Sequence, residues 1–136
     1  MEIPEAFRGI WKGIVEEDGQ YALANPYPCE IVIRNSKIVV YYQQSRITAW
    51  SEPYIMEVRD AEIRLDEPRC KRINGDRIIP CNKAGGISLT VTNAGLYYRW
   101  ANSNQVCTSQ LTKIKEVSTW VKLLNMQIAE LRGSAP

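Results

Sequence analysis

The chain has 136 residues, of which 45% are hydrophobic and 24% are charged, and its formal net charge is +2. This composition is typical of one globular domain with its own hydrophobic core, and it disfavours disorder. So small a charge gives no reason to expect a nucleic acid or an anionic membrane as a partner, and we expect neither. No apolar run approaches the roughly 20 residues that a membrane helix needs, so we expect a single soluble domain over residues 1–136.

Short apolar segments separated by turn residues fill most of the chain. Within them, apolar and polar residues alternate, which is the pattern of half-buried strands. Glycine, proline, asparagine and aspartate separate the segments, as expected for tight turns. The pattern predicts about 8–10 short strands among twelve candidate segments, and the strand pattern is weakest at Tyr21–Ala24 and Ile47–Trp50. The segments, in chain order, are Phe7–Glu16, Tyr21–Ala24, Cys29–Arg34, Lys37–Gln43, Ile47–Trp50, Tyr54–Arg59, Glu62–Leu65, Arg69–Ile73, Arg77–Cys81, Ile87–Thr92, Leu96–Trp100 and Gln105–Ile114.

Two pairs of these segments carry clear hairpin signals. Residues Ile87–Thr92 alternate apolar side chains with serine and threonine, and the turn sequence Asn93-Ala94-Gly95 follows. Leu96–Trp100 then leaves that turn as an aromatic strand. The second signal is Asn74-Gly75-Asp76, because asparagine and glycine favour the left-handed backbone of two-residue turns.

The end of the chain has helical instead of strand periodicity. Its apolar residues recur three and four positions apart, with polar residues between them, which predicts an amphipathic helix over about residues 117–132. We expect its apolar face to pack on the β structure, and the alternative is a dimerisation or partner-binding helix. The apolar positions are Val117, Trp120, Val121, Leu124, Ile128 and Leu131.

Many short strands followed by one helix predict a mainly β protein. Tight turns favour an antiparallel meander, and exposed sheet edges favour its closure. We therefore expect a β-barrel over about residues 7–114 with the helix packed on it. A β-sandwich is the alternative.

Two resemblances agree with this fold. Gly9-Ile10-Trp11 looks like the G-x-W of lipocalin and wider calycin barrels, in which the tryptophan packs across the closed end of the barrel. The late helix is also similar to that of lipocalins in its placement, whereas a T-D-Y-like turn and a lone arginine after the last strand are not recognisable. The chain also resembles small bacterial secreted β-domains of uncharacterised function, through Cys29, Cys70, Ser88–Thr92, Tyr97-Tyr98-Arg99-Trp100 and Gln110-Leu111-Thr112.

The four cysteines favour disulfides over a metal site. The chain has no histidine and no C-x-x-C pair, so zinc is disfavoured and we expect no metal. Cys70 and Cys81 face each other if the chain folds back between them, which leaves Cys29 with Cys107. The rival pairing joins Cys29 to Cys70 and Cys81 to Cys107, and four buried thiols are a further alternative.

Disulfides also bear on the compartment, because they persist in oxidising environments. The residues after Met1 lack the basic and apolar regions of a signal peptide. We expect a secreted or periplasmic protein whose signal peptide is absent from this sequence, with a cytoplasmic protein as the alternative.

The sequence argues against an enzyme. Without histidine, the usual general base near neutral pH is missing. The acidic groups Glu16-Glu17-Asp18 and Asp66-Glu67 fall in predicted turns, where solvated charge is expected. No phosphate-binding, dinucleotide-binding or calcium-binding loop is present, so we expect no cofactor.

Aromatic residues on the predicted strands are the best candidates for binding. Neighbouring residues on a strand point to opposite faces, so adjacent aromatics divide between core and surface. We expect a non-catalytic protein that binds a small apolar ligand in a hollow barrel, or a protein partner on its surface. The alternative is an interaction module such as an enzyme inhibitor, immunity protein or secreted effector; the oligomeric state stays open. The candidate binding residues are Tyr42, Trp50, Tyr54, Tyr98, Arg99 and Trp100.

Overall fold

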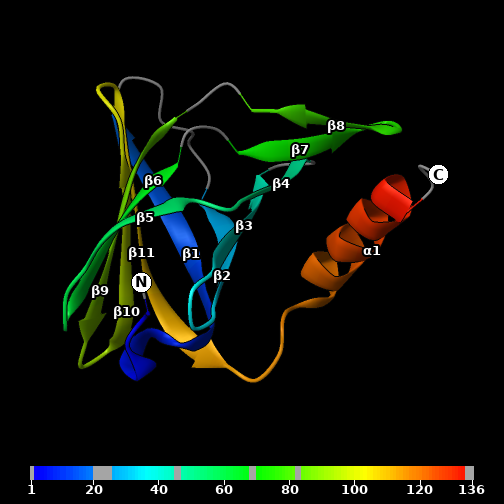
Figure 1. Ribbon diagram of the computed structural model, residues 1–136. Coiled ribbons are helices and arrows are strands. Elements are labelled where there is room, and N and C mark those ends of the chain that lie inside the picture. The colour runs from blue at the N-terminus through cyan, green and yellow to red at the C-terminus, as the bar shows by residue number, and fades with distance from the viewer. Residues whose placement is uncertain (1, 20–25, 45–46, 68–69, 82–83, 134–136) are drawn as a thin grey trace.

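A curled antiparallel sheet and one long helix make up most of the computed structural model, which describes residues 2–19, 26–44, 47–67, 70–81 and 84–133 (Figure 1). The predicted segment Tyr21–Ala24 lies outside the described residues. A short 3₁₀ helix, η1 (Glu5–Phe7), precedes the sheet, and α1 (Thr119–Gly133) follows it. The strands are β1 (Gly9–Gly19), β2 (Tyr27–Ile33), β3 (Ile38–Gln44), β4 (Ile47–Ser51), β5 (Tyr54–Val58), β6 (Glu62–Glu67), β7 (Lys71–Asn74), β8 (Arg77–Pro80), β9 (Gly85–Thr92), β10 (Gly95–Ala101) and β11 (Gln105–Ile114).

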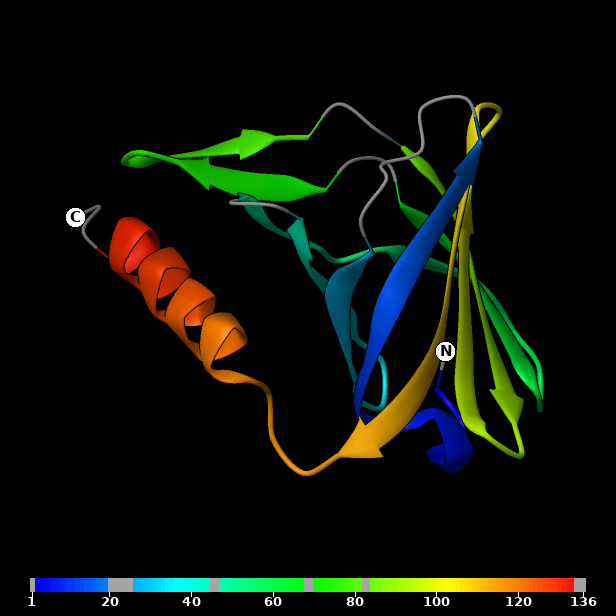
Figure 2. The same cartoon turned by 180° about the vertical axis from the view of Figure 1, so that it is seen from behind.

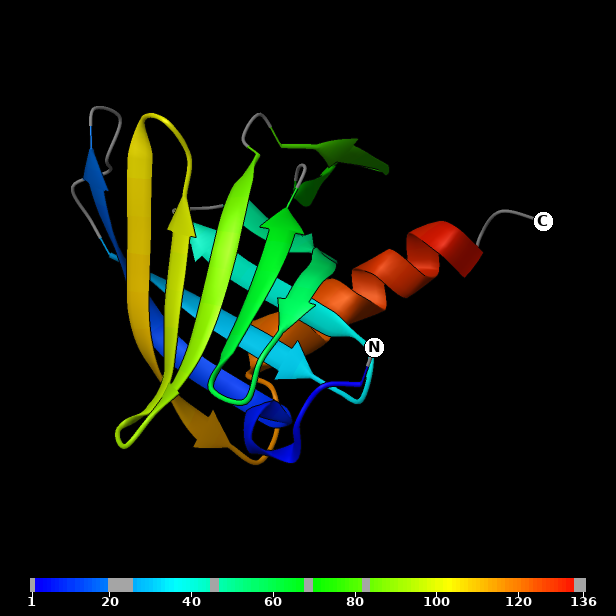
Figure 3. The same ribbon diagram turned by 60° about the vertical axis from the view of Figure 1, so that its left-hand side comes forward.

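The strand order shows why the sheet curls but does not close. In the described chain, eleven strands run β5-β6-β9-β10-β11-β1-β2-β3-β4-β7-β8, and the sheet curls through 280° as a half-barrel (Figure 3). In a closed meander β4 would pair with β5, the next strand in the chain. Among the described strands, β4 pairs instead with β7, and β5 pairs only with β6 at the opposite edge. The predicted closed barrel of about 8–10 strands was therefore wrong in closure and strand number, and the single sheet also differs from the alternative β-sandwich.

The inner face of the curl holds the main hydrophobic core. Strand alternation places residues there as predicted: on β10, Leu96, Tyr98 and Trp100 are buried, whereas Tyr97 and Arg99 are exposed. The largest fully buried apolar side chains of the inner core include Phe7, Ile31, Ile63, Leu89 and Leu111.

The tryptophan of the G-x-W sequence belongs to this inner core. Trp11 is 6% exposed, and its indole Nε1 donates a hydrogen bond to the Phe7 carbonyl oxygen at 2.9 Å. The Lys113 ammonium nitrogen lies 5.4 Å from the centre of the Trp11 ring, which is the range of a cation–π contact. Trp11 thus joins η1, β1 and β11.

The helix α1 packs on the outer face of the sheet, as its periodicity predicted (Figure 2). Val121, Leu124 and Ile128 of the helix are buried against the outward side chains of β2, β3 and β4. The start of the helix is held by Glu30, a fully buried carboxylate of β2 whose Oε1 accepts a hydrogen bond from the Ser118 backbone N–H at 2.8 Å. No helix in the described part of the chain has both the length and the apolar character to cross a membrane.

Both hairpin predictions are confirmed. Thr92 pairs with Gly95 across the loop Asn93-Ala94, and Asn74 pairs with Arg77 across the second loop. The β7–β8 hairpin projects away from the curl toward α1 (Figure 1).

The cysteines form one bridge where two were expected. Cys70 and Cys81 are joined by a disulfide at the base of the β7–β8 hairpin, as predicted. Cys29 and Cys107 are buried thiols, so the predicted Cys29–Cys107 bridge was wrong, as was the rival pairing. Cys29 lies on β2 and Cys107 on β11, with β1 between them. Alternate strands of a sheet lie roughly 10 Å apart, whereas a disulfide needs Cα atoms within about 7 Å.

Candidate functional site

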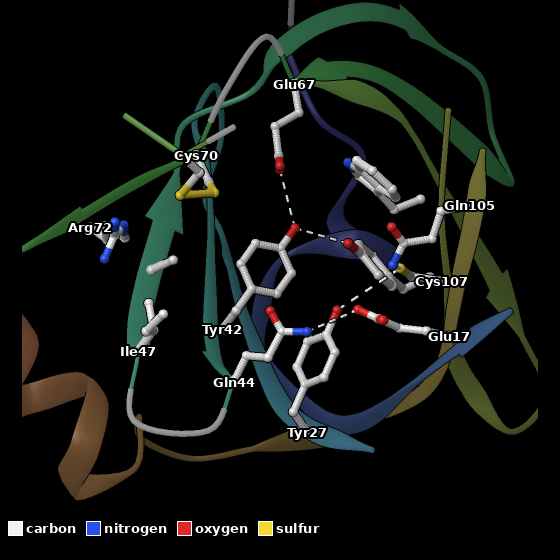
Figure 4. Close-up of a pocket in the computed structure, with 14 residues that line it drawn as sticks. Glu17, Tyr27, Tyr42, Gln44, Ile47, Glu67, Cys70, Arg72, Gln105 and Cys107 are labelled. Atoms are coloured by element: carbon white, nitrogen blue, oxygen red, sulfur yellow. Dashed lines mark hydrogen bonds between the residues drawn. A yellow bond between two sulfur atoms is a disulfide. The ribbon is translucent and has the colours of Figure 1, made fainter. Parts of the chain in front are cut away.

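A cavity of about 300 Å³ opens at the end of the curl where β1 ends and β2 begins (Figure 4). It lies between the inner face of the sheet and the disulfide at the base of the β7–β8 hairpin. The residues that line it are Glu17, Tyr27, Tyr42, Gln44, Ile47, Ala49, Glu67, Cys70, Arg72, Cys81, Tyr98, Trp100, Gln105 and Cys107.

A buried carboxylate is the centre of a first cluster of polar side chains in this cavity. Glu67, the last residue of β6, is 3% exposed. Its Oε2 accepts hydrogen bonds from the Ser51 hydroxyl at 2.6 Å and the Tyr42 hydroxyl at 3.1 Å. The hydroxyls of Tyr42 and Tyr98 lie 2.8 Å apart. Two strands, β3 and β4, therefore bring neutral donors to one acid, and β10 adds the Tyr98 hydroxyl beside Tyr42.

Burial raises the pKa of Glu67 above its ordinary value of 4.5, because desolvation penalises the charged form. The hydrogen bonds from Ser51 and Tyr42 act in the opposite direction. The Trp100 indole N–H also lowers the pKa of Glu67 by favouring its charged form. This N–H makes no hydrogen bond within the described part of the chain. No described cation forms an ion pair with Glu67.

A second cluster of polar side chains lies on the β1–β2 side of the cavity. The Tyr27 hydroxyl lies 3.9 Å from the Cys107 sulfur, and the Gln105 side-chain amide donates to the same sulfur at 3.7 Å. The Gln44 amide donates to Glu17 Oε1 at 3.1 Å. Burial raises the pKa of Tyr27, so its hydroxyl stays protonated at neutral pH.

Aromatic rings form much of the remaining wall. The centroids of Tyr27 and Tyr42 are 6.4 Å apart with the rings 68° to each other, and those of Tyr42 and Tyr98 are 6.5 Å apart at 57°. Burial raises the pKa of Tyr42 and Tyr98, so both remain neutral donors and acceptors. Gly85 allows the Trp100 indole to lie against β9, because a Cβ there would be 2.5 Å from Trp100 Cε2.

The structure brings together only some of the predicted binding residues. Tyr42, Tyr98 and Trp100 line the cavity. Trp50 points to the other face of its strand and packs in the cluster beneath α1. The remaining two lie away from the cavity, because Arg99 is on the outward face of β10 and Tyr54 is 65% exposed on edge strand β5.

Sequence reasoning missed the acids of the site, because it placed both in turns. β6 runs two residues further than predicted, so Glu67 shares the inward face with Ile63 and Leu65. β1 likewise extends to Gly19, and Glu17 then falls on the same face as Val15. Continuing the period-two alternation through the charged residues would have found both acids.

Replacing Glu67 by glutamine is expected to remove a pH dependence from the stability of the protein. A folded-state pKa above 4.5 means that the folded protein holds this proton more tightly than the unfolded chain does. The favourable contribution of Glu67 is therefore present at low pH and is lost as pH rises through the folded-state pKa. Relative to Glu67→Gln, the wild-type protein should lose about 1.4 kcal/mol for each pH unit by which the pKa is raised.

Urea unfolding of both proteins from about pH 4 to pH 8 measures this difference. A difference in unfolding free energy that stays constant over the range would contradict the raised pKa of Glu67.

The described residues contain no group of three histidine, cysteine or acidic side chains that could hold a metal ion. The site combines aromatic surface, neutral hydroxyls and carboxylates, which is chemistry suited to holding a small molecule in one orientation. No protein-family model and no curated protein sequence matches this chain.

Proposed function

We propose that this protein is a non-catalytic binding protein that holds a small ligand with an apolar body in the cavity of its half-barrel. The observation that carries the proposal is the cavity itself: about 300 Å³, walled by aromatic rings, with the buried Glu67 carboxylate on one side. Ligand sites typically enclose about 300–1,000 Å³ and combine apolar walls with a few convergent polar groups. The size favours a ligand with a single ring or a short chain.

The state of the polar groups supports binding over catalysis. The hydroxyls of Tyr27, Tyr42 and Tyr98 have raised pKa values and are poor bases or nucleophiles at neutral pH. The chain has no histidine to activate them. As hydrogen-bonding groups in a mostly apolar wall, they orient a ligand without reacting with it.

We also propose that the protein works outside the cytoplasm, as a secreted or periplasmic protein. The Cys70–Cys81 disulfide is consistent with an oxidising compartment. The bridge also borders the cavity, so it helps to hold the β7–β8 hairpin at the rim.

Filling the cavity tests the proposed function. Ala49 is 8% exposed and lines the cavity, so Ala49→Trp should occupy it. In a saturation-transfer NMR screen of small aromatic and aliphatic fragments, we expect the wild-type protein to bind several, and Ala49→Trp to weaken that binding at least tenfold. Ala94→Trp, in the exposed β9–β10 turn, is the matched control and should leave binding unchanged.

Thermal unfolding of each variant checks that it is folded, and Ala49→Leu gives a smaller filling residue if the tryptophan is not tolerated. Fragments that bind equally well to the filled variants, or a screen without any binding fragment, would overturn the proposed function.

A protein partner is the second candidate, favoured by the outer side of α1. Leu123 is 55% exposed and Met126 is 67% exposed on that helix, and their spacing of three residues places them next to each other on its surface. Neighbouring exposed apolar residues are a feature of interaction surfaces. A cavity without fragment binding would favour this interaction-module function over the first.

A further inference from the structure

We propose that the ligand of the cavity is a small organic cation, an amine with an aromatic or aliphatic body, whose ammonium group is held by Glu67. This inference rests on the proposed binding function and specifies the chemical class of the ligand.

The first observation is a buried acid that lacks a cation. Glu67 is 3% exposed, and both of its hydrogen bonds come from neutral hydroxyls, those of Ser51 and Tyr42. Buried carboxylates are normally paired with a cation, because an isolated buried charge is costly. In the described part of the chain Glu67 makes no ion pair. A ligand cation would supply the missing charge.

The second observation is that one oxygen of the Glu67 carboxylate accepts both of these hydrogen bonds. Ser51 and Tyr42 both donate to Oε2 of Glu67. A carboxylate accepts about four hydrogen bonds, so Oε1 keeps the capacity for further donors. An ammonium group brings three donors and a positive charge, and charge-assisted hydrogen bonds are roughly twice as strong as neutral ones.

The third observation is the aromatic wall around the acid. Tyr27, Tyr42, Tyr98 and Trp100 line the same cavity (Figure 4). The face of an aromatic ring carries negative charge and attracts a cation within about 6 Å of its centre. Rings therefore favour an amine over a neutral molecule of the same shape, in addition to packing against its apolar body.

The charged residues that line the cavity also favour a positively charged ligand. Among the described lining residues, Glu17 and Glu67 are acidic and Arg72 is the basic residue. Figure 4 shows Arg72 on the other side of the Cys70–Cys81 disulfide from Glu67. Both acids would repel an anionic ligand, whereas each of them would attract a cationic one.

Three probes that share a ring and differ in charge test the inference: 2-phenylethylamine, 2-phenylethanol and phenylacetate. In isothermal titrations at pH 7.5 with the wild-type protein, we expect the amine to bind at least tenfold more tightly than the alcohol, and phenylacetate to bind most weakly. In Glu67→Gln, amine affinity should fall at least tenfold while alcohol affinity changes less than threefold.

Retained alcohol binding also shows that the Glu67→Gln cavity is intact. Glu17→Gln removes the second acid of the same cavity, and because Gln44 already donates a hydrogen bond to Glu17, we expect it to lower amine affinity less than Glu67→Gln does. A larger loss in Glu17→Gln than in Glu67→Gln would overturn the assignment of Glu67. The comparison of probes on the wild-type protein needs no variant, so a misfolded variant would not decide the outcome.

The outcomes separate this inference from the proposed function. If the alcohol or phenylacetate binds as tightly as the amine, or if only uncharged and anionic fragments bind, the cation assignment is overturned and cavity binding stands. If no fragment of any charge binds in the cavity, the proposed function fails, and the cation assignment fails with it.

Discussion

Replacing Trp11 by alanine is expected to lower the free energy of unfolding by about 3–5 kcal/mol, which is the usual cost of removing a buried tryptophan. The indole is 6% exposed in the inner core. Its loss would leave a void between η1 and the sheet, would leave the Phe7 carbonyl without this donor, and would remove the contact with Lys113. The G-x-W tryptophan is therefore expected to be among the most sensitive positions of the fold.

Urea or thermal unfolding measures this effect, and the melting temperature should fall by roughly 10 °C or more. Trp120→Ala is the matched control. Trp120, on α1, is only partly buried against the outer cluster, and its loss should cost less than half as much. Equal losses at the two positions would contradict the view that the inner core dominates the stability.

Replacing Gly95 by alanine is expected to cost roughly 3 kcal/mol for two reasons. The residue has φ +132°, a backbone conformation that side chains with a Cβ rarely adopt. A Cβ would also overlap the carbonyl oxygen of Leu111 on β11, which is a backbone atom and cannot rotate away. The β9–β10 hairpin and its neighbour β11 would have to shift apart, and several ladder hydrogen bonds would weaken.

Two other glycines separate the two causes. Gly75 also has a positive φ, +66°, but no atom lies within 4 Å of its Cβ position, so Gly75→Ala should cost only about 1 kcal/mol. Gly86 has neither feature, with the nearest atom 4.0 Å away, and Gly86→Ala should stay within about 0.5 kcal/mol of the wild type. If all three substitutions lower the free energy of unfolding equally, the overlap with Leu111 does not explain the effect at Gly95.

The position of the cavity follows from the way in which the sheet stays open. Because β4 pairs with β7 and not with β5, the β7–β8 hairpin leaves the curl and its disulfide base stands at the cavity rim. A closed meander would have placed β5 against β4 at this position. The open sheet thus leaves room for Glu67 to meet Ser51 and Tyr42.

Much of the fold was predictable from local pattern. Period-two alternation located the strands to within a few residues, for example at Gln105–Ile114, and helical spacing located α1. The turn sequences at Asn74-Gly75 and Asn93-Ala94-Gly95 identified both hairpins. These features depend on residues close together in the chain, so the sequence alone carries the information.

The candidate site was predictable only in part. Alternation correctly divided the pair Tyr97 and Tyr98 between surface and core, and it brought Tyr98 and Trp100 to the inner face. It did not distinguish the inner face of the curl from the outer face beneath α1, so Trp50 was predicted as a binding residue although it packs under the helix. Each face of β4 carries a buried apolar residue, Ala49 on one and Trp50 on the other, and pattern alone does not say which element covers which face.

Local residue patterns were enough to identify the strands, the hairpins and the helix, because each arises from residues that are close together in the chain. The strand order, the open curl, the choice of Cys70–Cys81 over the rival pairing and the separation of Cys29 from Cys107 became clear only in three dimensions. The tertiary structure also converted Glu67 from an expected turn residue into a buried acid facing aromatic rings. These features depend on which distant strands pair, and strand pairing is a competition among many similar edges that local pattern does not rank.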